Sequence, residues 1–231
     1  MKIASEPKRF RTMVDVVPMV ESPTTLRIAT LNTWFMRDPL ALAAQLRSQL
    51  GGLTLDVLAL QEVSSSTSLA AFAKALGMHV AVSTVADDKV CLSNALLVRA
   101  EENVTSVESL QLFHPRECRA AVGLTLPRAQ TSFMCTHLDH REEQVRLGQL
   151  SALGSQSKLL TGPAVFVLGD FNALRRADYS DAAWEALVAK RAKAGIESET
   201  EVTAEIEAWG LTDCRNVATR VGGPLATCIH D

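Results

Sequence analysis

The order of strand-like and helix-like patterns along the chain limits the folds that it can adopt. Five apolar runs of strand type follow one another without a helical pattern between them, at residues 79–85, 95–99, 104–113, 120–126 and 132–136. Elsewhere in the chain, helices separate the strands. This order fits two packed sheets with helices outside them better than a purely alternating parallel sheet. We therefore predict an α/β fold.

Periodic apolar spacing and capping residues define the flanking elements. The spacing of Leu42, Leu46 and Leu50 predicts a helix over 39–50, ended by two glycines. Ser66 is expected to cap a second helix over 66–76, which Gly77 ends. Similar patterns predict helices at 141–159, 181–194 and 203–209, and strands at 26–31, 56–60 and 165–168.

Length and composition favour a single domain. A chain of 231 residues, 47% of them hydrophobic, can build one sizeable core. We assign residues 26–231 to this domain and residues 1–25 to a polar N-terminal arm, which lacks the apolar segment of a secretion signal. No segment is long and apolar enough to cross a bilayer. Five scattered cysteines without a Cys-x-x-Cys pair indicate reduced thiols, so the expected location is the cytoplasm.

The formal net charge of −3 argues against a polynucleotide as the main partner. Basic residues cluster locally, but each cluster has acidic neighbours, whereas proteins that hold long nucleic acids by their phosphates normally carry a stronger basic excess. Small phosphorylated molecules fit this charge balance better. Nothing in the sequence assigns an oligomeric state.

Polar side chains follow four of the predicted strands. A buried strand that ends in carboxylate and amide groups is a common way to build a phosphate- or metal-handling site on a rigid support. Each such residue alone is an ordinary turn, cap or surface residue. The recurrence of the arrangement is what favours a site. The strand-end residues are Asn32; Gln61 and Glu62; His137, Asp139 and His140; and Asp170 and Asn172.

These residue types suit metal-assisted chemistry on a phosphate. Mg²⁺ prefers oxygen ligands and keeps several waters, so one or two carboxylates such as Glu62 suffice to bind it. A carboxylate on the opposite side, such as Asp170, can orient or deprotonate the attacking water. The amides of Asn32 and Asn172 and the imidazole of His137 can hydrogen-bond the phosphoryl oxygens as their charge builds.

The same segments resemble the motifs of the endonuclease/exonuclease/phosphatase superfamily, the metal-dependent phosphoesterases that include the DNase I-like enzymes. The superfamily pattern is an Asn after the first strand, a Gln-Glu pair, a Thr-His strand end and Gly-Asp-x-Asn. This chain matches it with Asn32, Gln-Glu at 61–62, Thr-His at 136–137 and Gly-Asp-Phe-Asn at 169–172. The resemblance runs from about residue 26 to the end of the chain.

The resemblance implies a four-layer αββα sandwich of two mixed sheets and the hydrolysis of a phosphodiester or phosphomonoester. It implies that Mg²⁺, with Mn²⁺ as the alternative, is bound by Glu62 and Asn32. Catalysis would rest on His137, Asp170 and Asn172, and the phosphate would be held by Asn32, Asn172 and His137. Members of the superfamily cleave DNA, RNA, phosphoinositides, sphingomyelin and nucleotide-derived molecules. The acidic balance of this chain favours a small-molecule substrate over nucleic acid.

Two motifs of the superfamily have no counterpart in the sequence, a late Arg-Ile-Asp-Tyr strand and a C-terminal Ser-Asp-His. Residues 227–231 resemble the approach to the first of these, so we expect the last strands of the sandwich to be missing. In the superfamily, the absent Asp-His pair supplies acid–base or metal-binding function. Its loss is expected to leave this chain inactive or very weak.

Two other functions fit parts of the sequence. Without a catalytic tail, the scaffold could serve as a binding or regulatory module, because a fold does not determine a function. The segment 135–140 also resembles the zinc motif of the metallo-β-lactamase fold, which would place zinc on His137, Asp139 and His140. That motif should come early in the chain and be followed by further ligands, for which only His230 and Asp231 remain.

Three further expectations concern helices. Arg146 and Gln149 lie one turn apart on the same predicted helix and are expected to be solvated rather than to reach the site. Asp139 and His140 could bind substrate or cap that helix, with capping the leading expectation for Asp139. Trp184 and Trp209 are expected to be core residues.

Overall fold

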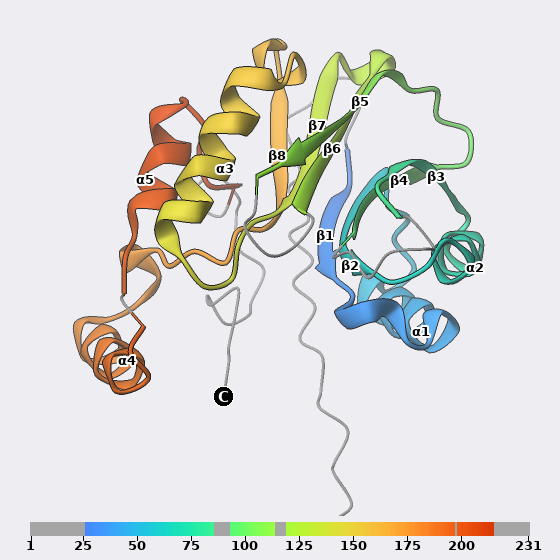
Figure 1. Ribbon diagram of the computed structural model, residues 1–231. Helices are drawn as coiled ribbons and strands as arrows, with labels where there is room; N and C mark the ends of the chain where they lie inside the picture. The colour runs from blue at the N-terminus through green and yellow to red at the C-terminus, as the bar shows by residue number, and fades with distance from the viewer. Residues whose placement is uncertain (1–25, 86–92, 114–118, 197, 215–231) are drawn as a thin grey trace, which may run out of the picture.

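The computed structural model describes residues 26–85, 93–113, 119–196 and 198–214 of the chain. Within them, two four-stranded sheets pack face to face, and helices cover the outer face of each sheet (Figure 1). The predicted α/β sandwich of two mixed sheets is therefore confirmed. The predicted N-terminal arm at 1–25 and the predicted truncation at 227–231 lie outside the described residues.

Each sheet combines one parallel pair with antiparallel neighbours. The first sheet has the order β1-β2-β4-β3, and helix α1 connects its parallel pair β1 and β2. The second has the order β5-β6-β7-β8, and helix α3 connects its parallel pair β7 and β8. The strands are β1 (Ile28–Asn32), β2 (Val57–Val63), β3 (Met78–Ser83), β4 (Ser93–Arg99), β5 (Thr105–Leu112), β6 (Arg119–Leu126), β7 (Thr131–His137) and β8 (Val165–Asp170). The helices are α1 (Pro39–Leu50), α2 (Ser66–Leu76), α3 (Glu143–Gln156), α4 (Asp181–Lys193) and α5 (Glu201–Ala208).

Three apolar cores hold the four layers together. The middle core lies between the sheets, where the ring of Phe133 stacks on that of Phe166 with their centroids 5.6 Å apart. Helices α1 and α2 cover the first sheet, and α3 and α5 cover the second (Figure 1). Because the first part of β2 is buried on both faces, residues 57–60 form a continuous apolar run instead of an alternating one.

The ends of the elements follow their local capping chemistry. Helix α1 has the predicted bounds, since Asp38 caps its first turn and Gly51 ends it in the left-handed conformation. Helix α2 also has its predicted span, but its N-cap is Ser65, whose side chain accepts a hydrogen bond from the Ser68 amide. The prediction that Ser66 is the cap was therefore wrong by one residue.

Strands β2 and β8 reach further than predicted because their ladders continue past the apolar run. Strand β2 extends to Val63, and β8 extends to Asp170, whose partner across the parallel ladder is His137. Helix α3 is shorter than predicted and is followed by a 3-10 turn over Leu159–Thr161. As a result, Glu62 and Asp170 lie within strands β2 and β8 and not in the loops after them. Their backbone is therefore fixed by regular structure.

The two helix tryptophans lie at the surface edge of the fold. Helix α4 contributes no buried residue, and Trp184 is half-buried beside Tyr179 with the Arg176 guanidinium over its ring. The prediction of a core role for Trp184 was therefore wrong. Trp209 packs on the third core from its edge, against Gly154 of α3. No helix in the described ranges is long and apolar enough to span a membrane.

Candidate active site

The candidate site lies where the two parallel pairs end. In a parallel pair the carboxyl ends of both strands reach the same edge of the sheet. The side chains of Asn32 from β1, Glu62 from β2, His137 from β7 and Asp170 from β8 meet at this edge of the sandwich. The strands of one sheet thus supply two of the groups, and the strands of the other supply the remaining two.

Asn32 links the two carboxylates. Its side-chain nitrogen donates to Oε1 of Glu62 and to Oδ2 of Asp170, at 3.0 Å in each case. Its side-chain oxygen accepts from the Trp34 amide at 3.0 Å, which fixes the orientation of the group. In this arrangement both amide protons serve the carboxylates, and Asn32 acts as a hydrogen-bond donor instead of offering its oxygen to a metal.

A β-bulge places Glu62. The ladder between β2 and β4 shifts register between Leu60 and Val63, and Glu62 adopts a positive φ of 56°. The buried Thr33 holds this bulge, because its hydroxyl donates to the carbonyls of Gln61 and Glu62 at 2.9 Å each. Thr33 was not singled out from the sequence, because its role depends on a strand 28 residues away.

Gln61 points into the core and not into the site. Its side-chain nitrogen contacts the hydroxyl of Thr30 at 3.1 Å and Sγ of Cys135 at 3.2 Å between the sheets. Burial raises the pKa of the Cys135 thiol to about 12, while hydrogen bonds with Gln61 and the Leu60 carbonyl lower it by less. Of the Gln-Glu pair, only Glu62 therefore reaches the candidate site.

His137 faces both carboxylates from the opposite sheet. Its Nε2 lies 3.9 Å from Oε1 of Glu62 and 4.0 Å from Oδ2 of Asp170, and its side chain is buried. These distances are too long for direct hydrogen bonds. The space between the imidazole and the carboxylates is therefore bordered by one nitrogen and two oxygens.

A glycine allows β8 to approach β7 at this point. Gly169 has a φ of 141°, and a Cβ there would lie 1.9 Å from the carbonyl oxygen of Thr136. After the strand, Asn172 has a positive φ of 48°, and its amide donates to Oδ1 of Asp170 at 3.0 Å. Its side-chain nitrogen donates to the carbonyl of Leu138 at 3.0 Å. Asn172 thus braces the turn after β7 in this structure.

The electrostatics of the site favour a cation. The side chains of Glu62 and Asp170 are only 14% and 27% exposed, and no Lys or Arg of the described residues forms an ion pair with either. Asn32 offsets their mutual repulsion with two hydrogen bonds but adds no charge. The described residues contain no group of three or more His, Cys, Asp or Glu arranged to hold a metal. A donor set of one or two carboxylates fits Mg²⁺, which keeps most of its waters.

The residues of the alternative zinc motif do not converge. Oδ1 of Asp139 accepts from the amides of Arg141 and Glu142, so this carboxylate organises the turn before α3. The N-cap of α3 is Glu142, so the prediction that Asp139 caps this helix was wrong. His140 is exposed and contacts the guanidinium groups of Arg119 and Arg141. The metallo-β-lactamase alternative is therefore wrong.

Arg146 and Gln149 are not solvated as predicted. Arg146 is 4% exposed and Gln149 is fully buried, and both contact the backbone of Asp139. Helical periodicity alone could not show this, because the turn after β7 that covers them belongs to another element.

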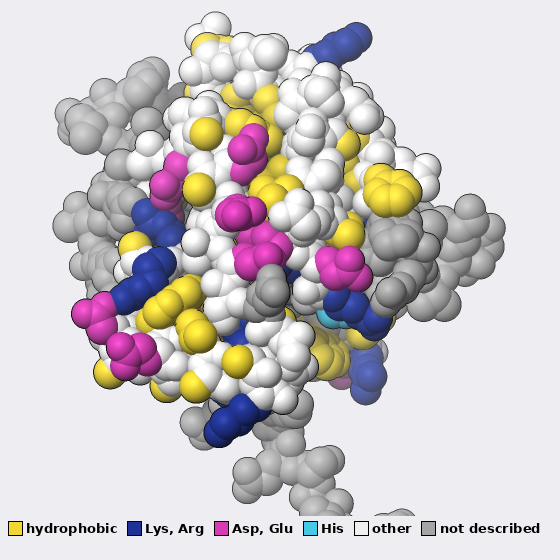
Figure 2. Space-filling view, turned by 60° about the vertical axis from the view of Figure 1, so that its left-hand side comes forward, with side chains coloured by type: hydrophobic (Ala, Val, Ile, Leu, Met, Phe, Trp, Pro, Cys, Tyr) yellow, Lys and Arg dark blue, Asp and Glu magenta, His cyan; other side chains and the backbone are white. Residues whose placement is uncertain are grey.

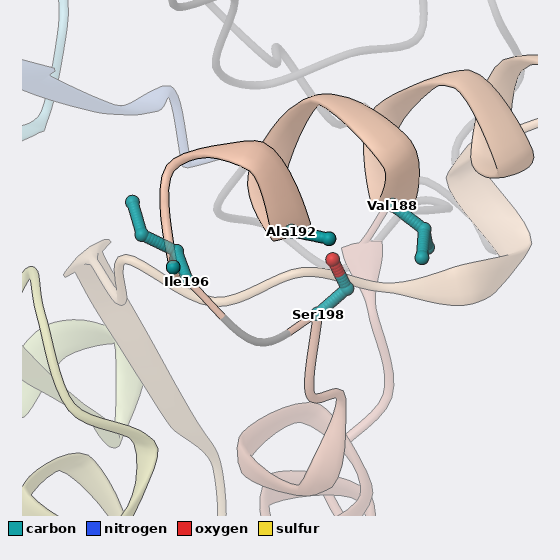
Figure 3. A pocket seen from close by; sticks show the side chains of 5 residues that line it. Val188, Ala192, Ile196 and Ser198 are labelled. Carbon is teal, nitrogen blue, oxygen red and sulfur yellow. The ribbon is translucent and has the colours of Figure 1, made fainter.

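A surface hollow elsewhere on the molecule is not part of this site. It lies beside α4 and is lined by Val188, Ala192, Gly195, Ile196 and Ser198 (Figure 3). It contains no titratable side chain and none of the strand-end residues. We assign no chemistry to it.

Comparison with known proteins supports the fold. The chain matches no family model and no curated protein. Its structure is similar to that of the mannosyl-6-phosphatase Bt3783 of Bacteroides thetaiotaomicron VPI-5482, with a TM-score of 0.50 and 18% identity over 71% of this chain and 70% of that one. A functionally unknown conserved protein of Enterococcus faecalis V583 gives a TM-score of 0.50 and 16% identity, over 69% of this chain and 71% of that one.

A third similar structure is D. rerio TDP2 complexed with a single-strand DNA product, with a TM-score of 0.50 and 22% identity. This match covers 65% of the present chain and 61% of the TDP2 chain. At such identities the similarity concerns the fold and does not transfer a substrate. The described part of the chain has the fold of the endonuclease/exonuclease/phosphatase superfamily.

Proposed function

We propose that the chain is a phosphoester hydrolase that uses Mg²⁺ or Mn²⁺. The observation that carries the proposal is the contact of Asn32 with the carboxylates of both Glu62 and Asp170, with the His137 imidazole facing them. A cation bound between two carboxylates that share one hydrogen-bond donor would offset their mutual repulsion. A phosphate group, whose own charge is negative, would then be attracted by the metal and by the donors around it.

Each side chain has a role that follows from its contacts. Glu62 would bind the metal, and when bound, Mg²⁺ polarises a phosphoryl oxygen and neutralises charge on the leaving group. Asp170 would orient the attacking water and accept its proton as the water oxygen bonds to phosphorus and the P–O bond of the ester breaks. His137 would donate a hydrogen bond to a phosphoryl oxygen, and Asn32, whose two amide protons go to Glu62 and Asp170, would hold the two carboxylates in place. Asn172 would keep Asp170 in place through its backbone amide.

We favour a small phosphoester over a polynucleotide as the substrate. Glu201, Glu205 and Glu207 of α5 are exposed, and Figure 2 shows acidic side chains at the centre of one face of the molecule, with basic ones beside them. Exposed carboxylates repel a nucleic-acid backbone. The three similar structures include a sugar phosphatase and a protein bound to a DNA product, so phosphoesters of both sizes are found among them.

Metal binding tests the first half of the proposal. Adding Mg²⁺ or Mn²⁺ at about 100 times its dissociation constant should stabilise the folded chain by about 2.7 kcal/mol, a rise in Tm of about 5–10 °C. Glu62→Gln should abolish this rise. The control, Glu101→Gln, alters a carboxylate that is 65% exposed and remote from the site, and should keep it. A wild-type Tm that does not respond to either metal would refute the proposal.

Turnover tests the second half. A panel of phosphomonoesters and phosphodiesters should contain at least one that the wild-type chain hydrolyses in the presence of metal, and Asp170→Asn should lower the rate at least about 100-fold. Turnover at a substantial rate would also contradict the prediction that this chain is weak. Metal binding without any turnover would instead favour the binding or regulatory module.

A further inference from the structure

The backbone of one residue beside the candidate site is held at both of its polar groups by helix α3. The amide of Asp139 donates to Oε1 of Gln149 at 2.8 Å, and the carbonyl of Asp139 accepts from Nη1 of Arg146 at 3.0 Å. All three residues are buried, and Gln149 also donates to the carbonyl of Phe113 at 3.1 Å. The turn after β7 is therefore tied to α3 and, through it, to the end of β5.

The preceding residue ties the same turn to the site. The amide of Leu138 donates to the carbonyl of Asp170, and the carbonyl of Leu138 accepts from the side chain of Asn172, both at 3.0 Å. Leu138 follows His137 directly. A shift of Asp139 would therefore move the carbonyl that holds Asn172 and the backbone that carries the His137 ring.

The guanidinium of Arg146 is itself fixed by a buried ion pair. Its Nε donates to Oε2 of Glu143 at 2.8 Å, and Oε1 of Glu143 accepts from the amide of Val202 in α5 at 3.0 Å. Burying such a pair costs desolvation energy, and apolar residues of similar volume often stabilise a fold as well or better. The pair is thus poorly explained by stability and is better explained by its contact with the turn.

We propose that Gln149 and Arg146 are positioning residues that hold the turn at 138–139, so that His137 faces the phosphate of the substrate and Asn172 keeps Asp170 in place. The inference rests on the proposed phosphoester hydrolase function. A displacement of about 1 Å at a catalytic group can lower a rate by about 100-fold. Loss of either tether is therefore expected to lower kcat by about 10- to 100-fold, while KM stays within about 2-fold because Glu62, which would bind the metal, is untouched.

Two variants remove the tethers by different routes. Gln149→Met keeps the length of the side chain but removes the acceptor for Asp139. The double variant Glu143→Leu with Arg146→Met replaces the whole ion pair by apolar groups. The gain from removing a buried pair is offset by the lost partners of the Val202 amide and the Asp139 carbonyl, so Tm should stay near that of the wild type. Both should lower kcat. A fall in kcat without a fall in Tm is a result that a merely structural network would not produce.

The matched control is Asp56→Asn. Asp56 is also fully buried and paired with two arginines, Arg99 and Arg128, but it precedes β2 at the edge of the sheet opposite to Glu62. The length of β2 separates the two by about 20 Å. This variant should lower Tm while kcat stays within about 2-fold of the wild type.

A spectroscopic readout separates this inference from the proposed function. The side-chain amide signal of Asn172 in a ¹⁵N–¹H spectrum, assigned with Asn172→Asp, should shift in Gln149→Met and in the double variant but not in Asp56→Asn. This readout needs no turnover, so it decides the inference even if no phosphoester is hydrolysed. An unchanged Asn172 signal, an unchanged kcat, or a kcat that falls only in step with Tm in all variants would overturn it.

Discussion

Replacing Gly169 by alanine should separate β7 from β8 at the candidate site. A Cβ on Gly169 would lie 1.9 Å from the carbonyl oxygen of Thr136, whereas a carbon–oxygen contact needs about 3.3 Å. The strands would therefore have to part by about 1.4 Å, enough to stretch a ladder hydrogen bond of about 2.9 Å beyond its useful range. Asp170, the next residue, would move with the strand.

The cost follows from two terms. An L-residue at a φ of 141° is strained by about 1–3 kcal/mol. Two weakened backbone hydrogen bonds add about 1 kcal/mol each. The sum is about 4 kcal/mol, a large part of the 5–15 kcal/mol that stabilises a typical domain. For a chain of this length the corresponding fall in Tm is about 8–16 °C.

The assay is urea unfolding followed by tryptophan fluorescence, with thermal unfolding as a second measurement. Gly148→Ala is the matched control, because Gly148 lies in helix α3 and a Cβ there meets no atom within 4 Å. That variant should be more stable than the wild type by about 0.5–1 kcal/mol. If Gly169→Ala unfolds at the wild-type urea midpoint, the argument from close strand approach is refuted.

Three further predictions concern other parts of the fold. Thr33→Val removes the hydroxyl that donates to the carbonyls of Gln61 and Glu62. The free energy of unfolding in urea should therefore fall by about 1–3 kcal/mol, and the rise in Tm on adding Mg²⁺ should become smaller. An unchanged rise in Tm would contradict the role of Thr33 in holding the bulge. Ser65→Ala should lower the free energy of unfolding by about 1 kcal/mol, because it removes the N-cap of α2. An equal loss of stability in Ser66→Ala would contradict the assignment of Ser65 as the cap. Because the folded-state pKa of Cys135 is raised from 9.0 to about 12, its contribution to stability should be constant below pH 9 and be lost as pH rises towards 12, since the unfolded thiol ionises first. Cys135→Ala should flatten the dependence of unfolding free energy on pH in this window, and an unchanged slope would contradict the raised pKa.

Much of the fold follows from local sequence. The predicted span of α1 agrees with the structure at both ends because Asp38, Pro39 and Gly51 act on neighbouring backbone groups. The strand-end residues could be named because polar groups directly after an apolar run mark where a strand reaches the edge of a sheet. Their common location, however, depended on a resemblance to known motifs, and their individual roles stay predictions.

By itself, the sequence determined the α/β class, nearly all the helices and strands, and the set of polar residues from which a site can be built. Only the tertiary structure decided that Glu62 enters the site while Gln61 faces the core, and that Arg146 and Gln149 are buried against Asp139. The physical reason is distance along the chain. Capping and apolar periodicity act within a few residues. The bulge, in contrast, depends on Thr33, which is 28 residues from Gln61 in the sequence. The ion pair between Glu143 and Arg146 is completed by the amide of Val202 in α5, which is 59 residues from Glu143.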